Sequence, residues 1–191
     1  ELVFPEIFLS LSIMFLLILG VFKKDSSKLV LNISLIALLI TAVITFNETL
    51  GIQKILLFND SIIIDYLSSF MKIVTLLAAF SVLVISTNYL KIFKIFKIEY
   101  PILILSSVLG MMVMISSNDL IVFYMGLELQ SLALYVLATF NRDQLKSSEA
   151  GLKYFVLSAL SSGLLLYGCS LIYGFTGSTN FDFIASQLNS N

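Results

Sequence analysis

A glutamate in the middle of a long apolar stretch is the side chain in this sequence with the clearest potential for chemistry. Glu128 lies near the midpoint of Leu120 to Phe140. Three polar side chains share its helical face, at i−4, i+3 and i+7: Tyr124, Ser131 and Tyr135. An ionisable group near the centre of a bilayer costs at least ~2.5 to 3.5 kcal/mol to insert, so its presence indicates a functional role. The pattern predicts a proton-carrying carboxyl group on a polar stripe that can order water.

A second interpretation of Glu128 is structural. A protonated glutamic acid can hydrogen-bond across a helix interface and hold two membrane helices together. Serine, threonine or asparagine can form such a bond without the cost of an ionisable group, so the proton-carrying interpretation is favoured. The small residues from Ser158 to Gly163 predict close helix packing, with hydroxyl contacts to water as the lesser alternative.

Lys153 is the candidate cation on the next apolar stretch, Glu149 to Tyr173. It lies four residues, or ~6 Å, from the start of that stretch, whereas Glu128 lies ~18 Å from the corresponding end of its own. We therefore do not expect a direct ion pair. Lys153 could carry protons, form a salt bridge with Glu149 at i−4, or snorkel to the headgroups. Glu6 and Lys72 lie near the ends of their stretches and are predicted to cap or snorkel.

Composition places all these residues in a membrane. Of 191 residues, 59% are hydrophobic and 12% are charged, and the mean hydropathy is +1.03. The sequence has no histidine and only one cysteine, Cys169, which excludes zinc clusters, iron–sulfur ligation, haem ligation by histidine and intrachain disulfides. The net charge of −1 predicts no nucleic-acid partner. We expect a lipid bilayer as partner and no cofactor held by this chain.

The fold class follows from six stretches that approach the length needed to cross a bilayer. They predict an all-α, polytopic transmembrane helical bundle. The stretches are Val3 to Phe22, Leu29 to Phe46, Tyr66 to Tyr89, Tyr100 to Ser116, Leu120 to Phe140 and Glu149 to Tyr173. The longest connection, Asn47 to Asp65, holds two short apolar runs that we expect at the interface or in a short hairpin.

Basic residues in the connections predict the orientation. The first, third and fifth connections contain Lys23, Lys24, Lys28, Lys91, Lys94, Lys97, Arg142 and Lys146. The connections on the other side contain Lys54 alone. By the positive-inside rule the basic side faces the matrix or cytoplasm, and both termini face outward. The segment Lys91 to Lys97 is predicted to be a solvated inner loop, with recruitment of anionic lipid as an alternative.

Several motifs resemble subunit 2 of the NADH dehydrogenase of respiratory complex I. The similarity is densest in Ser117 to Tyr135, which includes Glu-Leu-Gln-Ser-Leu from Glu128 onward, and in Ser148 to Gly163. It continues through Leu165 to Gly177, and Phe4-Pro-Glu-Ile7 is similar to the start of that subunit. Glu-Leu-Gln-Ser-Leu distinguishes subunit 2 from the related subunits 4 and 5.

The resemblance implies a function and a set of site residues. Glu128 matches the fifth-helix glutamate of that family, and Lys153 matches the lysine of its sixth-helix motif Glu-Ala-Gly-Leu-Lys-Tyr. The family couples quinone reduction elsewhere in the complex to proton movement along a hydrated axis of such residues. The implied protein is a proton-translocating subunit of NADH:ubiquinone oxidoreductase, with flavin, iron–sulfur clusters and quinone in other subunits. Implied partners are the other membrane-arm subunits. The mitochondrial inner membrane is the expected location, with a bacterial inner membrane as the alternative.

Two other functions stay open from the residues alone. One is a subunit of a multi-subunit sodium/proton antiporter, and the other is a scaffold of the membrane arm that carries no protons. The resemblance also implies a division of the chain. Residues 1–99 would hold three N-terminal helices, and residues 100–191 would hold helices four to six, the start of an antiporter-like inverted repeat. Because that family has further helices, we expect a second chain to supply them, or this sequence to be a fragment.

Overall fold

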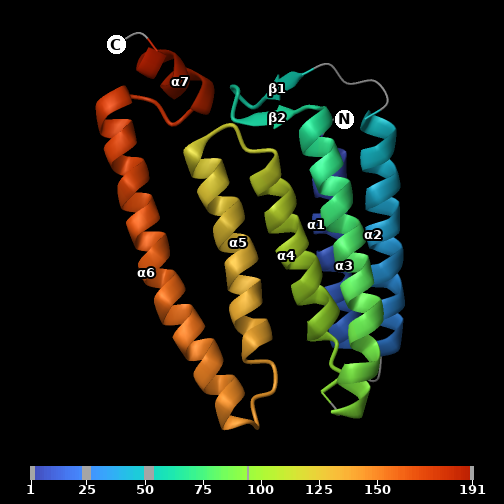
Figure 1. The fold of residues 1–191 in the computed structure, drawn as a ribbon. Coiled ribbons are helices and arrows are strands. Elements are labelled where there is room, and N and C mark those ends of the chain that lie inside the picture. The colour runs from blue at the N-terminus through green and yellow to red at the C-terminus, as the bar shows by residue number, and fades with distance from the viewer. Residues whose placement is uncertain (1–2, 23–26, 50–53, 94, 190–191) are drawn as a thin grey trace.

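The computed structural model describes the chain except residues 1–2, 23–26, 50–53, 94 and 190–191. Its long helices run side by side as a bundle, with a small two-stranded sheet and a short helix at one end (Figure 1). The helices are α1 (Phe4–Phe22), α2 (Ser27–Thr49), α3 (Tyr66–Ile92), α4 (Glu99–Ile115), α5 (Leu120–Ala138), α6 (Leu145–Thr176) and α7 (Phe181–Asn189). The strands are β1 (Ile55–Leu57) and β2 (Ile62–Ile64).

The predicted all-α, multi-pass architecture is confirmed. Five of the described helices, α1, α2, α3, α5 and α6, are long and apolar enough to cross a membrane. Helix α4 has 17 residues, a length of about 26 Å, and is the shorter sixth member of the bundle. The six expected stretches therefore all correspond to helices.

Helix α6 begins earlier than expected. It starts at Leu145 instead of Glu149, has 32 residues, and ends before Gly177, which takes a left-handed conformation with φ 71°. Its first turn is held against the end of α5, because the hydroxyl of Ser147 donates to the carbonyl of Ala138 at 2.8 Å. The contact involves Ser147, which precedes the predicted apolar stretch. Apolar periodicity alone therefore predicted the start of the helix too late.

A further short helix follows Gly177, since Phe181–Asn189 forms α7. Asn180 explains the start of this helix, because its side-chain oxygen accepts a hydrogen bond from the backbone N–H of Phe183 at 3.1 Å.

Helices α1 to α4 form the packed core. Nine described apolar side chains from these helices are almost fully buried: Leu9, Leu16, Val30, Leu38, Leu76, Leu83, Leu105, Val108 and Met112. Helix α5 packs against α4, and α6 packs against α5 at the edge of the bundle (Figure 1). Lipid is as apolar as these side chains, so close packing rather than exclusion of water holds such helices together.

A pair of glycines sets the position of α5. A Cβ added at Gly110 of α4 would lie 2.7 Å from the carbonyl oxygen of Gly126, and one added at Gly126 would lie 2.9 Å from that of Gly110. The two backbones therefore approach as closely as only small residues allow. Because Gly126 lies two residues before Glu128, this contact also places the candidate site.

The outer end of the bundle is closed by the hairpin of β1 and β2. The strands pair antiparallel, which confirms the hairpin alternative for the long connection. Its turn needs left-handed backbone at Phe58, Asn59 and Asp60. The amide of Asn118, between α4 and α5, donates to the Asp60 carbonyl at 3.0 Å and to the Asp182 carboxylate at 3.1 Å. The hairpin, the α4–α5 turn and the start of α7 therefore form one hydrogen-bonded cap.

Most of the described cations on which the predicted orientation rests can be placed at one end of the bundle. Lys28, Lys97, Arg142 and Lys146 lie at the end opposite the hairpin, whereas Lys23, Lys24 and Lys94 lie outside the described residues. We expect Lys97→Cys to react with a membrane-impermeant thiol reagent from the matrix or cytoplasmic side only, and Asn59→Cys from the other side only. Both variants would also carry Cys169→Ser, so that the introduced cysteine is the thiol that reacts with the reagent. The reverse pattern of labelling would overturn the topology.

Candidate functional site

Glu128 occupies the face of α5 that carries the polar stripe. Its side chain is half-buried, and its Oε1 atom is buried without a hydrogen-bond partner among the described residues. A buried carboxyl oxygen without a partner is costly in a low-dielectric interior. The carboxyl group interacts with Tyr124 one turn earlier on α5, and its Oε1 can in addition bond to water or to a group from a neighbouring helix.

Tyr135 connects this stripe to α6. Its side chain is buried, and its hydroxyl donates to the hydroxyl of Ser158 at 2.5 Å. Its ring meets those of Tyr154 and Phe155 edge to face, at centroid distances of 4.9 and 5.7 Å. The hydroxyl of Ser131 donates to the Leu127 carbonyl within α5. Tyr135 is therefore the member of the stripe that reaches across to the next helix.

The contacts between α5 and α6 set their register. Gly151 lies directly against Thr139, and Phe155 lies against Tyr135. Continuing this antiparallel register by two turns brings Ser162 opposite Glu128. Ser162 is one of two buried residues on α6. For this segment the sequence favoured close packing, with hydroxyl contacts to water as the lesser alternative. The spacing of Ser158 and Ser162, one turn apart, is the sequence feature that indicates a hydroxyl-bearing face.

Lys153 does not meet Glu128. Its Nζ lies 2.6 Å from Oε1 of Glu149, and both side chains are more than half exposed. The register places Lys153 level with Leu137, nine residues from Glu128, which corresponds to about 14 Å along the helices. The expectation of no direct ion pair and the alternative of an i−4 salt bridge both agree with this geometry.

Glu6 and Lys72 form a second charged site, which the sequence did not predict. Lys72 Nζ lies 2.5 Å from Glu6 Oε1, and the residues are only 3% and 8% exposed. The prediction that they cap or snorkel was wrong, because α1 and α3 both pack against α2 and α4, and the two side chains meet in the interior of the bundle. Glu48, at the end of α2, lies within electrostatic range of both. Glu6 Oε2 has no hydrogen-bond partner in the described part of the chain.

No group of three or more histidine, cysteine, aspartate or glutamate side chains among the described residues is arranged to hold a metal ion. The chemistry that this geometry supports is the binding and transfer of protons. The two arrangements that could take part are the α5–α6 face around Glu128 and the buried pair of Glu6 and Lys72.

Known proteins resemble this chain. A family model described as NADH:quinone oxidoreductase/Mrp antiporter, TM, matches residues 117–191. NADH-quinone oxidoreductase subunit N of Pelagibacter ubique is 72% identical over 189 residues, which are 99% of this chain and 40% of that protein. The chain is therefore similar to subunit N proteins over nearly its whole length. It spans about 40% of the length of the curated subunit N relatives from Pelagibacter ubique and Maricaulis maris.

Solved structures agree with this similarity. A chain of respiratory complex I from Thermus thermophilus superposes with a TM-score of 0.78 at 26% identity, covering 92% of this chain and 38% of that one. A chain of the Mrp complex from Dietzia superposes with a TM-score of 0.74 at 22% identity, covering 92% of this chain and 35% of that one. The second likeness shows a shared fold only. The match to subunit N extends over nearly the whole chain, beyond the motifs that indicated it.

Proposed function

We propose that this subunit N chain is part of the membrane arm of a proton-translocating NADH:quinone oxidoreductase, with Glu128 as a proton-carrying group. The observation that carries the proposal is the buried Oε1 of Glu128, which has no hydrogen-bond partner among the described residues. The Glu128 carboxyl interacts with Tyr124, which lies on the same helix, so this contact does not join two helices. An oxygen that is buried but unengaged is suited to exchange a proton with water.

The proposed path inward runs along the α5–α6 interface. Glu128 and Lys153 are too far apart for direct transfer, so intermediate groups are needed. Tyr135 and Ser158 lie between them and are already hydrogen-bonded to each other. Both hydroxyls can donate and accept, as a relay requires. Lys153, paired with Glu149 at the inner end of α6, would exchange protons with the inner aqueous phase.

The antiporter and scaffold alternatives are less well supported. Identity of 72% to a subunit N over almost the whole chain favours the oxidoreductase. The likeness to the Mrp complex is a likeness of fold. A scaffold without proton transfer leaves the insertion cost of Glu128 unexplained.

The location and the cofactors follow from the same assignment. Flavin, iron–sulfur clusters and quinone would be held by other subunits. The relatives named above are from the bacteria Pelagibacter ubique and Maricaulis maris, which favours a bacterial inner membrane over the mitochondrial one expected from the sequence.

The outward face of α6 is the proposed contact with the rest of subunit N. Gly163 and Gly174 lie three turns apart on one face of α6 and have nothing described within 4 Å of an added Cβ, in contrast to Gly151 on the α5 side. Small residues without close contacts suit the approach of another helix. In this proposal, helices corresponding to the remaining length of the relatives pack here.

Purification of the native particle tests the function. We expect the chain, captured through an affinity tag, to bring with it subunits that contain flavin and iron–sulfur clusters, and the particle to oxidise NADH. Cross-links from Gly163→Cys should reach subunit N helices outside residues 1–191. Capture with a set of membrane antiporter subunits and no flavin would refute the oxidoreductase assignment.

A further inference from the structure

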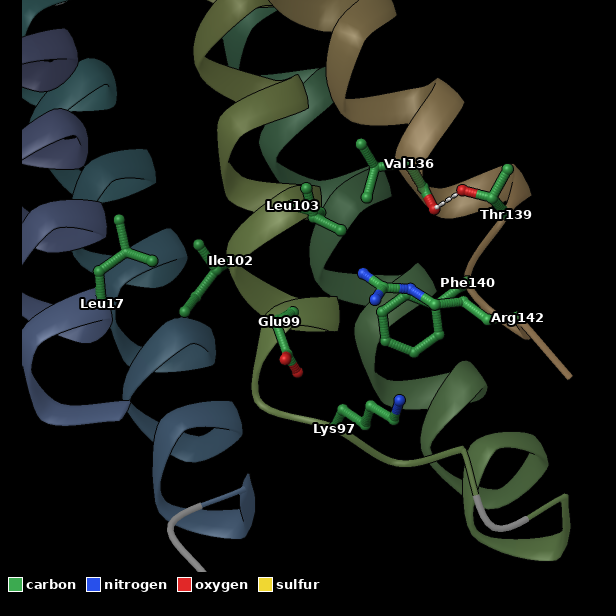
Figure 2. Close-up of a pocket in the computed structure, with 9 residues that line it drawn as sticks. All are labelled: Leu17, Lys97, Glu99, Ile102, Leu103, Val136, Thr139, Phe140 and Arg142. Carbon is green, nitrogen blue, oxygen red and sulfur yellow. Dashed lines mark hydrogen bonds between the residues drawn. The ribbon is translucent and has the colours of Figure 1, made fainter. Parts of the chain in front are cut away.

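A cavity with two cationic groups opens near the inner end of the bundle. It holds about 270 Å³ and lies between α1, α4 and α5 (Figure 2). Lys97 comes from the segment before α4, and Arg142 comes from the connection between α5 and α6. Figure 2 shows Leu103 and Val136 above the charged groups, toward the middle of the bundle. The cavity therefore combines a basic edge with an apolar wall.

The two cations are available to a ligand. Within the described residues, neither Lys97 nor Arg142 forms an ion pair within 4.0 Å. The N-terminus of α4 lies at the same place. The N–H of Tyr100 already donates to the Lys97 carbonyl at 3.4 Å and Pro101 has no N–H, so the two side-chain cations supply the positive charge of the cavity. Glu99 also lines the cavity and reduces its net charge to +1.

The position of the cavity identifies the chemistry of its occupant. Lys97 and Arg142 lie just beyond the inner ends of α4 and α5, where the headgroups of the inner leaflet lie. That leaflet is rich in anionic lipid, and basic pockets between membrane helices on this side bind such headgroups. A free phosphate ion would leave the wall of Leu17, Leu103 and Val136 in contact with water, whereas an acyl chain would cover it.

We propose that this cavity binds one anionic phospholipid, with its phosphate between Lys97 and Arg142 and an acyl chain along the apolar wall. The net charge of +1 fits a lipid with a single negative charge. The site is separate from the Glu128 face, and the proposal does not depend on the catalytic function of the complex.

Photo-cross-linking in the native complex tests the site. The complex is reconstituted in phosphatidylcholine vesicles that contain a trace of phosphatidylglycerol with a diazirine on its acyl chain. Peptides around Leu103 and Val136 should be labelled. Lys97→Gln with Arg142→Gln should reduce this labelling by about fivefold for each cation removed. Glu99→Gln should increase it, because it removes the one negative side chain of the cavity.

Matched variants separate the site from general charge attraction. Lys28→Gln with Lys146→Gln removes the same charge from exposed positions at the inner end and should leave the labelling unchanged. Lys97→Arg with Arg142→Lys keeps both charges and should retain it even if the neutral double variant fails to assemble. Equal labelling by a diazirine phosphatidylcholine, equal loss in the control pair, or displacement by inorganic phosphate would each overturn the proposal.

Discussion

Replacing Glu128 by glutamine is expected to leave the complex assembled and to stop proton transfer through this chain. Glu128→Gln keeps the shape and polarity of the side chain but removes its ability to release a proton. The loss of a positioned acid–base group slows proton transfer by about 100-fold or more. The measurement is NADH-driven acidification of sealed vesicles, divided by the rate of NADH oxidation in the same vesicles.

Asp143→Asn is the matched control for Glu128→Gln. It makes the same chemical change at an exposed position in the connection between α5 and α6. We expect this variant to translocate protons at the wild-type ratio. Wild-type coupling in an assembled Glu128→Gln complex would contradict the proton-carrying role and would favour the structural interpretation of this residue.

Breaking the buried pair of Glu6 and Lys72 is expected to give the largest loss of stability. Lys72→Met leaves the carboxylate of Glu6 buried without its partner, which costs about 3 to 5 kcal/mol. Glu6→Leu alone should cost a similar amount, because it leaves the ammonium group buried. The double variant should recover most of the loss, since neither charge remains. Thermal inactivation of the purified protein in detergent measures these differences.

The exposed pair of Glu149 and Lys153 provides the control for this prediction. Glu149→Gln should change stability by no more than about 1 kcal/mol, because exposed ion pairs contribute little. If the double variant of Glu6 and Lys72 proved as unstable as either single variant, then packing volume, not charge pairing, would explain the effect.

The features that the sequence predicted correctly are those that depend on local pattern. Apolar stretches of sufficient length identified the helices, because the bilayer sets their length. Glu128 was singled out by the same kind of local evidence, because an ionisable group in such a stretch is unusual, and its role stays a prediction. The contact of Lys153 with Glu149 was foreseen as an alternative because i and i+4 face each other on any helix.

The features that the sequence did not predict depend on how helices meet. Glu6 and Lys72 are far apart in the chain, and neither helix alone shows that its partner lies opposite. The same holds for Lys97 and Arg142, which share a cavity only because α4 and α5 pack closely. The reciprocal contact of Gly110 and Gly126 produces that packing and is not visible in composition.

Infrared difference spectroscopy of the native complex tests the central claim most directly, because it observes protonated carboxyl groups themselves. Spectra recorded before and during NADH oxidation should show a change in the carbonyl band of a protonated carboxylic acid. We predict that one component of this change is absent in the Glu128→Gln complex and present in the Asp143→Asn complex. Identical difference spectra from wild-type and Glu128→Gln complexes would show that Glu128 does not exchange its proton during turnover.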